Sequence, residues 1–182
     1  MKTNLLSGAL LAALALSGCS NQAQKSPDVT SDIRKSLDQA GLKDVSVDQD
    51  RDKGVVTLSG TTQTDDQKLQ AETIARSIAT TQVVADQIAV RPSGEESTAR
   101  KVDSDVDKGI EKNIDAVLVR HKLYSNVKYD VKNGVVTLKG KVDSESRRTA
   151  VEKMAAAVPN VKQVVNELEV RNRKATSSSS SD

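Results

Sequence analysis

The segment Gly54-Val-Val-Thr-Leu-Ser-Gly60 recurs 80 residues later as Gly134-Val-Val-Thr-Leu-Lys-Gly140. The same offset continues without a gap as far as Val90-Arg91, which matches Val170-Arg171. A repeat of this length that occurs only twice is typical of a duplicated globular domain, because a solenoid needs more and shorter repeats. The sequence therefore predicts two small domains with the same fold.

Each repeat begins with a predicted helix. Apolar residues recur every four positions from Val29 to Leu37 in the first repeat and from Val102 to Leu118 in the second, which is the spacing of one helix face. Asp28 and Asp103 are predicted at the N-terminal ends of these helices, because a carboxylate is favourable at the positive end of the helix dipole.

A β-hairpin follows the first helix. Apolar and polar residues alternate from Val127 to Lys132, which predicts a strand, and Asn133-Gly134 predicts a tight turn into the next strand. Thr64 and Ser144 then begin a second helix, and a last strand ends each repeat. The predicted fold class is α+β, with the order α-β-β-α-β and a three-stranded mixed sheet covered by two helices.

Turn chemistry agrees with this order. The four glycines that bound the second strands are predicted to be structural turn residues: Gly54, Gly60, Gly134 and Gly140. After the second helix of repeat two, Asn160 suits a left-handed backbone. Thr80 holds the equivalent place in repeat one and suits that backbone poorly.

Residues 1–18 have the pattern of an export signal. Lys2 precedes an apolar stretch from Leu5 to Leu16, which is too short to span a bilayer as a helix. The sequence Leu16-Ser-Gly-Cys19 resembles the lipobox of bacterial lipoproteins. This resemblance implies cleavage before Cys19 and lipidation of that residue, and Ser20 favours the periplasmic face of the outer membrane. The alternative is an ordinary secretory signal that a cysteine follows by chance.

The repeated Gly-Val-Val-Thr-Leu-x-Gly motif and the order of elements resemble the BON domain family. The resemblance divides the chain into a signal peptide (1–18), a tether (19–27), BON domain 1 (28–91), a linker (92–101), BON domain 2 (102–172) and a disordered serine-rich tail (173–182). It implies a pair of binding modules. In lipoproteins of this family the second domain binds lipid with a large apolar anchor, and this chain has no Trp. Repeat one departs from the family pattern at Thr80 and at Asp86, where Asn166 is more typical.

Charge is distributed unevenly between the repeats. Residues 28–91 carry a net charge of −3, and residues 101–174 carry +5. A basic domain near a membrane attracts anionic head groups, at about 1 kcal/mol per well-placed Lys or Arg. Four residues expected at one edge of domain 2 are the candidate phospholipid-binding site: Lys139, Lys141, Arg147 and Arg148. The alternative is an ordinary solvated surface, because Asp143 and Glu145 lie among them.

No enzyme chemistry is indicated. Cys19 is expected to carry lipid, and His121 lies at the end of a long amphipathic helix, where a solvated position is the simpler interpretation. Asp48, Asp50 and Asp52 alternate, but this segment lacks the Gly and Glu of a calcium loop and is predicted to be a polar strand face. We therefore predict no catalytic residue, no metal and no cofactor.

The partners predicted from the sequence are a membrane, through the lipid on Cys19, and anionic phospholipid or envelope proteins. Nucleic acid is not predicted, because the chain is exported and has no aromatic stacking platform. Tyr129 is expected in the core, with Tyr124 as a partly exposed cap. The predicted function is an envelope lipoprotein that binds phospholipid and supports outer-membrane integrity or stress tolerance. The alternative is a periplasmic stress adaptor or chaperone that docks protein clients, for which an exposed third-strand edge is the expected place.

Overall fold

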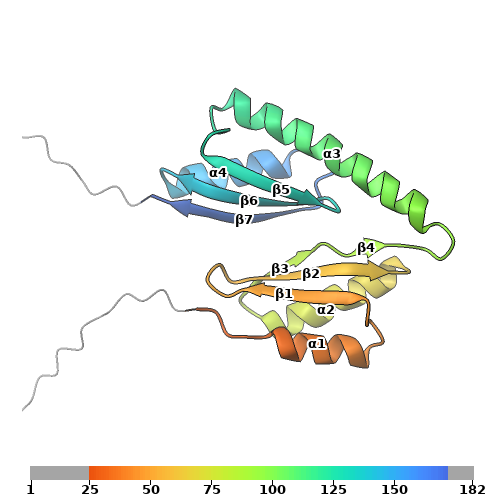
Figure 1. Cartoon of the computed structure of the whole chain (residues 1–182). Helices are drawn as coiled ribbons and strands as arrows, with labels where there is room; N and C mark the ends of the chain where they lie inside the picture. Colours follow the sequence, from red (N-terminus) through yellow and green to blue (C-terminus); the bar gives the residue numbers. More distant parts are fainter. Residues whose placement is uncertain (1–24, 172–182) are drawn as a thin grey trace, which may run out of the picture.

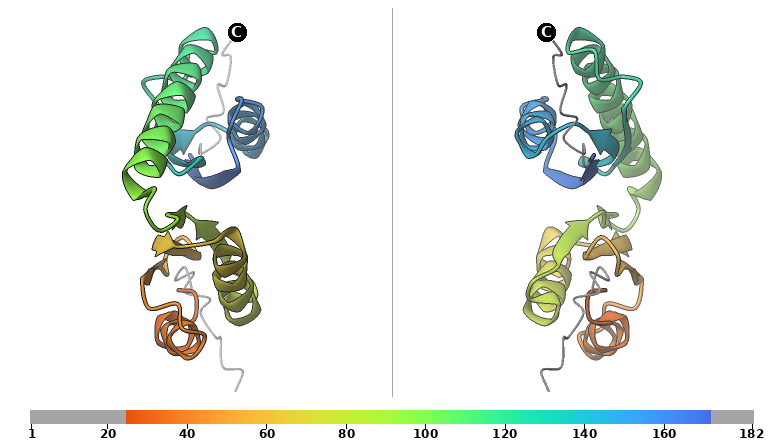
Figure 2. Two further views of the ribbon diagram at one scale, coloured as in Figure 1. Left: turned by 90° about the vertical axis from the view of Figure 1, so that its right-hand side faces the viewer. Right: turned by 90° about the vertical axis from the view of Figure 1, so that its left-hand side faces the viewer.

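The computed structural model describes residues 25–171. Two α+β domains lie one above the other, and each has its helices on the outer face of its sheet (Figure 1). The views along the strands show the two sheets back to back in the middle of the molecule, between the two pairs of helices (Figure 2). The predicted signal peptide, Cys19 and the predicted tail lie outside the described residues.

Domain 1 has the predicted order of elements, and its last strand is interrupted. The elements are α1 (Thr30–Gln39), β1 (Val45–Asp50), β2 (Val55–Thr62), α2 (Asp65–Ala79), β3 (Val83–Asp86) and β4 (Ala89–Val90). Strand β1 is antiparallel to β2, while β3 and β4 are parallel to it. The predicted single third strand is therefore present as two short pieces that keep the same register.

Domain 2 repeats this order with an uninterrupted third strand. Its elements are α3 (Glu96–Arg120), β5 (Val127–Lys132), β6 (Val135–Val142), α4 (Glu145–Ala156) and β7 (Gln163–Val170). The sheet order is β5-β6-β7, with β5 antiparallel and β7 parallel to β6. The mixed sheet predicted for both domains is confirmed.

The first helix of domain 2 starts earlier than the sequence indicated. Helix α3 begins at Glu96, whereas the apolar pattern placed its start near Asp103. The second half of the segment expected to be a linker is thus helical. Periodicity could not reveal this turn, because residues 96–101 contain no large apolar side chain to bury. Asp28, by contrast, lies where expected, just before α1, and its carboxylate accepts a hydrogen bond from the Thr30 N–H at 3.1 Å.

The second helices begin as their sequences predict. The Thr64 hydroxyl accepts from the Gln67 N–H, and the Ser144 hydroxyl accepts from the Arg147 N–H, each at 3.2 Å. The Gln67 side chain in turn accepts from the Gln63 N–H, which is one residue earlier than in a capping box. These caps satisfy N–H groups that have no partner within the helix.

Each domain has its own aliphatic core between its sheet and its helices. In domain 1, Ile33 and Leu37 of α1 pack with Leu58 of β2 and with the small residues of α2. The corresponding core in domain 2 contains Ile110, Ile114 and Leu138. Because the chain has no Phe or Trp, these cores depend on close packing of medium-sized side chains.

Candidate functional site

The four basic residues predicted from the sequence lie at one end of domain 2, on two different layers. Lys139 and Lys141 share the helix-free face of β6 with Val135, because alternate strand residues point to the same side. Arg147 and Arg148 lie in the first turn of α4, which covers the opposite face. The two lysines and the two arginines lie at the same end of domain 2 because only residues 143 and 144 separate β6 from α4.

Acidic neighbours partly neutralise this group. Lys141 forms an ion pair with Glu169 at 3.7 Å, and Lys139 is directly opposite Glu167 in the β6–β7 register. Arg148 is held by the protein: its Nη2 donates to the Asn166 carbonyl at 3.2 Å and its Nη1 lies 3.5 Å from Glu145. Lys139 and Arg147 are exposed, and neither has an ion-pair partner within residues 25–171. These two are the best placed to meet a ligand.

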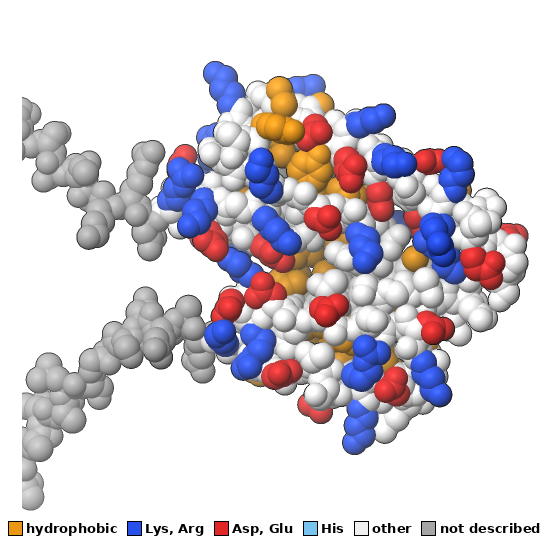
Figure 3. Space-filling view, viewed as in Figure 1, with side chains coloured by type: hydrophobic (Ala, Val, Ile, Leu, Met, Phe, Trp, Pro, Cys, Tyr) orange, Lys and Arg blue, Asp and Glu red, His pale blue; other side chains and the backbone are white. Residues whose placement is uncertain are grey.

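An exposed apolar corner lies beside the basic residues. Val119, near the C-terminus of α3, is 61% exposed, and Tyr124 in the following loop is 52% exposed. The ammonium of Lys128 lies 5.6 Å from the Tyr124 ring centre, within the range of a cation–π contact. Hydrophobic side chains gather at this corner over the end of α3 (Figure 3). Lys and Arg side chains flank them.

The second tyrosine has a structural role at the same corner. Tyr129 packs against the domain 2 core, and its hydroxyl donates to the Asp115 carboxylate at 2.6 Å. Burial and this neighbouring carboxylate raise the pKa of the Tyr129 hydroxyl well above its usual value. Tyr129 therefore stays neutral and joins β5 to α3, which leaves Tyr124 as the aromatic side chain available at the surface. His121 is the exposed C-cap residue of α3.

The two domains contact each other through equivalent positions of their helix-free faces. Val55 and Ala85 of domain 1 form one buried cluster with Val135 and Val165 of domain 2. Each of these pairs is related by the 80-residue offset of the repeat. The contact therefore has approximate two-fold character, in which each sheet presents the same two positions to the other.

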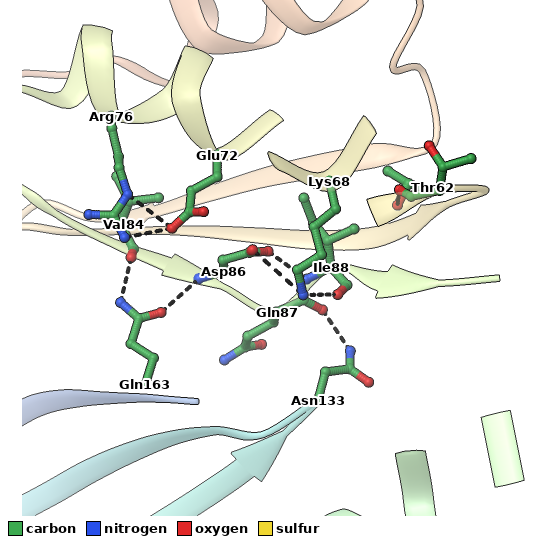
Figure 4. A network of polar contacts seen from close by, with 11 residues as sticks. Thr62, Lys68, Glu72, Arg76, Val84, Asp86, Gln87, Ile88, Asn133 and Gln163 are labelled. Atoms are coloured by element: carbon green, nitrogen blue, oxygen red, sulfur yellow. Dashed lines mark hydrogen bonds and ion pairs between the residues drawn. The ribbon is translucent and has the colours of Figure 1, made fainter. Parts of the chain in front are cut away.

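A side-chain amide of domain 2 completes this contact at the edge of β3. Gln163 Nε2 donates to the Val84 carbonyl at 2.7 Å, and Gln163 Oε1 accepts from the Asp86 N–H at 3.1 Å (Figure 4). A peptide group of an added strand would make the same two hydrogen bonds. Asn133 Nδ2 donates to the Gln87 carbonyl at 2.7 Å. The edge of β3 is thus covered by domain 2.

These contacts bear on the expected strand-edge docking site. In domain 1 the expectation of an exposed third-strand edge is wrong, because Gln163 and Asn133 occupy it. In domain 2 the middle of β7 is blocked locally: Arg148 binds the Asn166 carbonyl, and the Asn166 side chain accepts from the Leu168 N–H at 3.2 Å. Side chains that occupy edge backbone groups discourage strand addition.

A buried carboxylate marks the same position in domain 1. Asp86 accepts from the Ile88 N–H at 3.1 Å and lies 3.6 Å from the Lys68 ammonium, which donates to the Ile88 carbonyl (Figure 4). Desolvation by burial raises the pKa of Asp86, and the Ile88 hydrogen bond and Lys68 oppose that rise. A polar hollow of about 260 Å³ lies beside it, lined by both cationic and anionic side chains from the two domains.

Other predictions concern metals and membranes. Asp48 and Asp50 are exposed on β1, and Asp50 accepts hydrogen bonds from the N–H groups of Asp52 and Lys53, so this acidic segment forms a turn. Within residues 25–171 no three His, Cys, Asp or Glu side chains are grouped to hold a metal. None of the helices in that range has the length and apolar character needed to cross a bilayer.

The fold and the site define a tandem α+β module. One end of it carries basic residues beside an exposed apolar corner, and its two domains pack against each other. The family model of the BON domain matches residues 16–92 and 106–172, and the chain belongs to this family. It is 30% identical over 146 residues to osmotically-inducible protein Y of Escherichia coli (strain K12), covering 79% of this chain and 71% of that protein. It is 31% identical over 144 residues to an uncharacterized protein from the gshII 5' region of Anaplasma centrale, covering 78% of this chain and 92% of the relative.

Among solved structures, the chain is similar to the C-terminal domain of CdsD, a structural protein of the Type III secretion system of Chlamydia trachomatis. The TM-score is 0.33 at 12% sequence identity, and the match covers 78% of this chain and 67% of that one.

Sequence reasoning missed the domain interface and the exposed Val119. The signal for the interface was present, because Val55-Val56 and Val135-Val136 are consecutive apolar residues. A strand with one solvated face alternates apolar and polar residues, so two adjacent valines indicate that both faces are buried.

Proposed function

We propose that this protein is a cell-envelope lipoprotein, anchored through Cys19 at the periplasmic face of the outer membrane, whose second domain binds anionic phospholipid. The observation that carries this proposal is the placement of Lys139 and Arg147. Both are exposed without an ion-pair partner among the described residues, and both lie at the end of the molecule that also holds Lys25, six positions after Cys19. A short tether would keep these cations near the head groups.

The apolar corner offers a contact for the bilayer interface. Tyr124 combines an exposed ring with a polar hydroxyl, which is the character of side chains that reside at head-group level. Val119 adds exposed aliphatic surface, and Lys128 supplies a cation beside the ring. This corner takes the place of the missing Trp as a shallow anchor, and the cations contribute about 1 kcal/mol each near an anionic surface.

A role in envelope integrity or stress tolerance follows from lipid binding and from the family. The chain resembles a relative that is named for induction by osmotic stress. Binding, and not catalysis, is the proposed activity, because the conspicuous polar clusters of the described domains are explained by structure: Asp86 with Lys68, and Asn166 with Arg148 and Glu152.

The test is co-sedimentation of residues 20–182, which lack the lipid, with vesicles of phosphatidylglycerol or of phosphatidylcholine over a series of salt concentrations. We expect binding to the anionic vesicles alone, and weaker binding as salt rises. The double variant Lys139→Glu/Arg147→Glu should bind at least about tenfold more weakly, because each reversal replaces an attraction of about 1 kcal/mol with a repulsion.

Lys108→Glu/Lys112→Glu is the matched control, because both lysines are exposed on α3 and neither forms an ion pair with any described residue. Equal losses in the control and the double variant would indicate a general charge effect and no defined site. If the soluble chain binds neither kind of vesicle, phospholipid recognition by domain 2 is wrong, and protein partners in the envelope become the function to test.

A further inference from the structure

The start of the described chain is bound to domain 1 and does not hang free. The Ser26 N–H donates to the Arg51 carbonyl at 2.9 Å, and Arg51 Nε donates back to the Ser26 carbonyl at 2.8 Å. The Gln49 and Gln82 side-chain amides both donate to the Pro27 carbonyl, at 2.7 and 3.2 Å. Residues 26 and 27, which the sequence assigned to a tether, are thus held by backbone and side-chain hydrogen bonds.

This docking places the tether at one end of a two-domain body. Lys25 lies 3.3 Å from Asp52 in the β1–β2 turn. The adjacent Lys53 forms an ion pair with Glu169 at the end of β7, and Glu169 also pairs with Lys141. A series of alternating charges therefore runs from the tether across the domain 1 turn to domain 2. We define the anchored end as residue 25, the 51–54 turn, the C-terminal ends of β6 and β7, and the first turn of α4.

The anchored end exists as one surface because the domains pack in opposite directions. The β1–β2 turn of domain 1 meets the end of β7, whereas the β5–β6 turn of domain 2, at Asn133, meets Gln87 far from the tether. In Figure 1 the first and last described residues leave at the left, and the segment joining the domains lies at the right. The strands run between the two ends, and the eight residues of β6 separate them by roughly 25 Å.

We propose that the docked tether orients the molecule so that the anchored end is its membrane-facing surface, and that the surface it meets is the anionic head-group region of the bilayer. This inference rests on the proposed lipid anchor at Cys19. The six residue steps from Cys19 to Lys25 span at most about 20 Å. The anchored end therefore stays close to the bilayer, with Arg147 and the Tyr124 corner toward it. The 92–95 segment between the domains faces away.

The experiment uses the full lipidated protein in vesicles of equimolar phosphatidylcholine and phosphatidylglycerol that contain a head-group quencher. Because Cys19 is the only cysteine of the chain and is acylated, a single added cysteine carries the fluorophore. Ser125→Cys reports on the anchored end, since the neighbouring Asn126 carbonyl accepts from the Lys141 N–H. Ser93→Cys reports on the opposite end. We expect quenching at residue 125 to be several-fold stronger than at residue 93.

Each outcome is decisive. If the protein sediments with the vesicles but both positions are quenched equally, or residue 93 more, the orientation is wrong while the proposed anchor stands. If the lipidated protein does not sediment with vesicles, the anchor and the orientation both fail.

A second variant tests the docking itself. Arg51→Ala removes the hydrogen bond to the Ser26 carbonyl and should lower the ratio of quenching between residues 125 and 93. Arg76→Ala is the control, because it removes an exposed ion pair with Glu72 on α2 and touches no tether residue. An unchanged ratio in Arg51→Ala, in a protein that is folded and bound, would show that the tether contact does not set the orientation.

Discussion

The third strands of the two domains differ although their registers are the same. Val83 lies opposite Val55 in domain 1, and Gln163 lies opposite Val135 in domain 2, so Val83 and Gln163 are equivalent positions. Gln163 reaches across to the edge of β3, whereas Val83 is 47% exposed and has no polar atom to offer in return. Duplication thus preserved the register of each third strand, although the strand of domain 1 is interrupted between β3 and β4. At this pair of equivalent positions, only domain 2 contributes a polar side chain to the interface, so this part of the contact is one-sided.

The largest expected effect concerns Gly60 and Gly140, which were predicted to be turn residues at the ends of the second strands but lie within β2 and β6. At Gly60 (φ 103°) an added Cβ would lie 2.0 Å from the Asp44 carbonyl oxygen, and at Gly140 (φ 123°) it would lie 2.2 Å from that of Asn126. Gly60→Ala and Gly140→Ala should each lower the free energy of unfolding by roughly 3 kcal/mol or more, because backbone must move in a strained conformation. Urea denaturation of each variant measures this.

Gly109→Ala is the control for these variants, because Gly109 lies within α3 with nothing within 4 Å of an added Cβ. It should be neutral or stabilising, since Ala has the higher helix propensity. If Gly60→Ala or Gly140→Ala had the stability of the wild type, the close approach of the backbone at that position would not require glycine.

The next largest effect should distinguish the third strand of domain 2 from that of domain 1. Gln163→Ala removes two hydrogen bonds at the domain interface and leaves the Asp86 N–H without that partner, which should cost about 1–3 kcal/mol. Val83→Ala at the equivalent exposed position should change stability by less than about 0.5 kcal/mol. We expect small-angle scattering to show a more extended particle for Gln163→Ala alone. Equal behaviour of the two variants would contradict the one-sided contact.

Much of each domain could be predicted because its causes are local. Asn133 and Gly134 both have positive φ, at 51° and 82°, as an Asn-Gly turn requires. Asn160 likewise has a φ of 67°, in agreement with its expected left-handed backbone. The basic residues of the candidate site lie at one end of domain 2, since the short β6–α4 connection brings Lys141 and Arg147 near each other along the chain, and their role in binding stays a prediction.

The pairing of these residues could not be predicted, because it depends on partners that lie far away in sequence. Lys53 and Glu169 are 116 residues apart, and Gln163 is 79 residues from Val84. Nothing in the local sequence of Lys141 identifies Glu169 as its neutralising neighbour. Only the register of β7 and the opposed packing of the domains bring these charges together.

A third comparison concerns Asp86 and its equivalent, Asn166. Both side chains accept from the N–H two residues later, but Asn166 also donates to Glu152 at 2.8 Å, whereas burial disfavours the charge on Asp86. Asp86→Asn should therefore stabilise the protein at pH 7, because it removes a buried charge whose hydrogen bond to Ile88 and pairing with Lys68 do not fully offset its desolvation. Asn166→Asp should destabilise it, because the new carboxylate would face Glu152.

The direction of the Asp86 pKa shift determines how the stability of the wild type changes with pH. The pKa of Asp86 is raised in the folded state, so folding favours its protonated form. Its favourable contribution is complete below the unfolded pKa of about 3.9 and is lost as pH rises through the raised folded pKa. The stability difference between Asp86→Asn and the wild type should therefore shrink as pH falls from the raised folded pKa toward about 4, and should be nearly absent below that pH. Denaturation at several pH values measures it, and a difference that grows in acid would contradict the burial argument.

The smallest expected effect lies at the ends of the second helices. Thr80 ends α2 with φ 44° and ψ −80°, a strained region for a β-branched residue. The equivalent Asn160 tolerates its positive φ, and Pro159 before it lacks the N–H that would continue the helix, which explains why α4 ends at Ala156. Thr80→Gly should raise the free energy of unfolding by about 0.5–1 kcal/mol, because relief of strain exceeds the entropy that glycine adds to the unfolded chain. Asn160→Gly should change it much less, since Asn already suits the site. Thermal unfolding of the two variants compares them directly. If Asn160→Gly stabilised the protein more than Thr80→Gly, the backbone would be more strained at Asn160 than at Thr80, which contradicts this prediction.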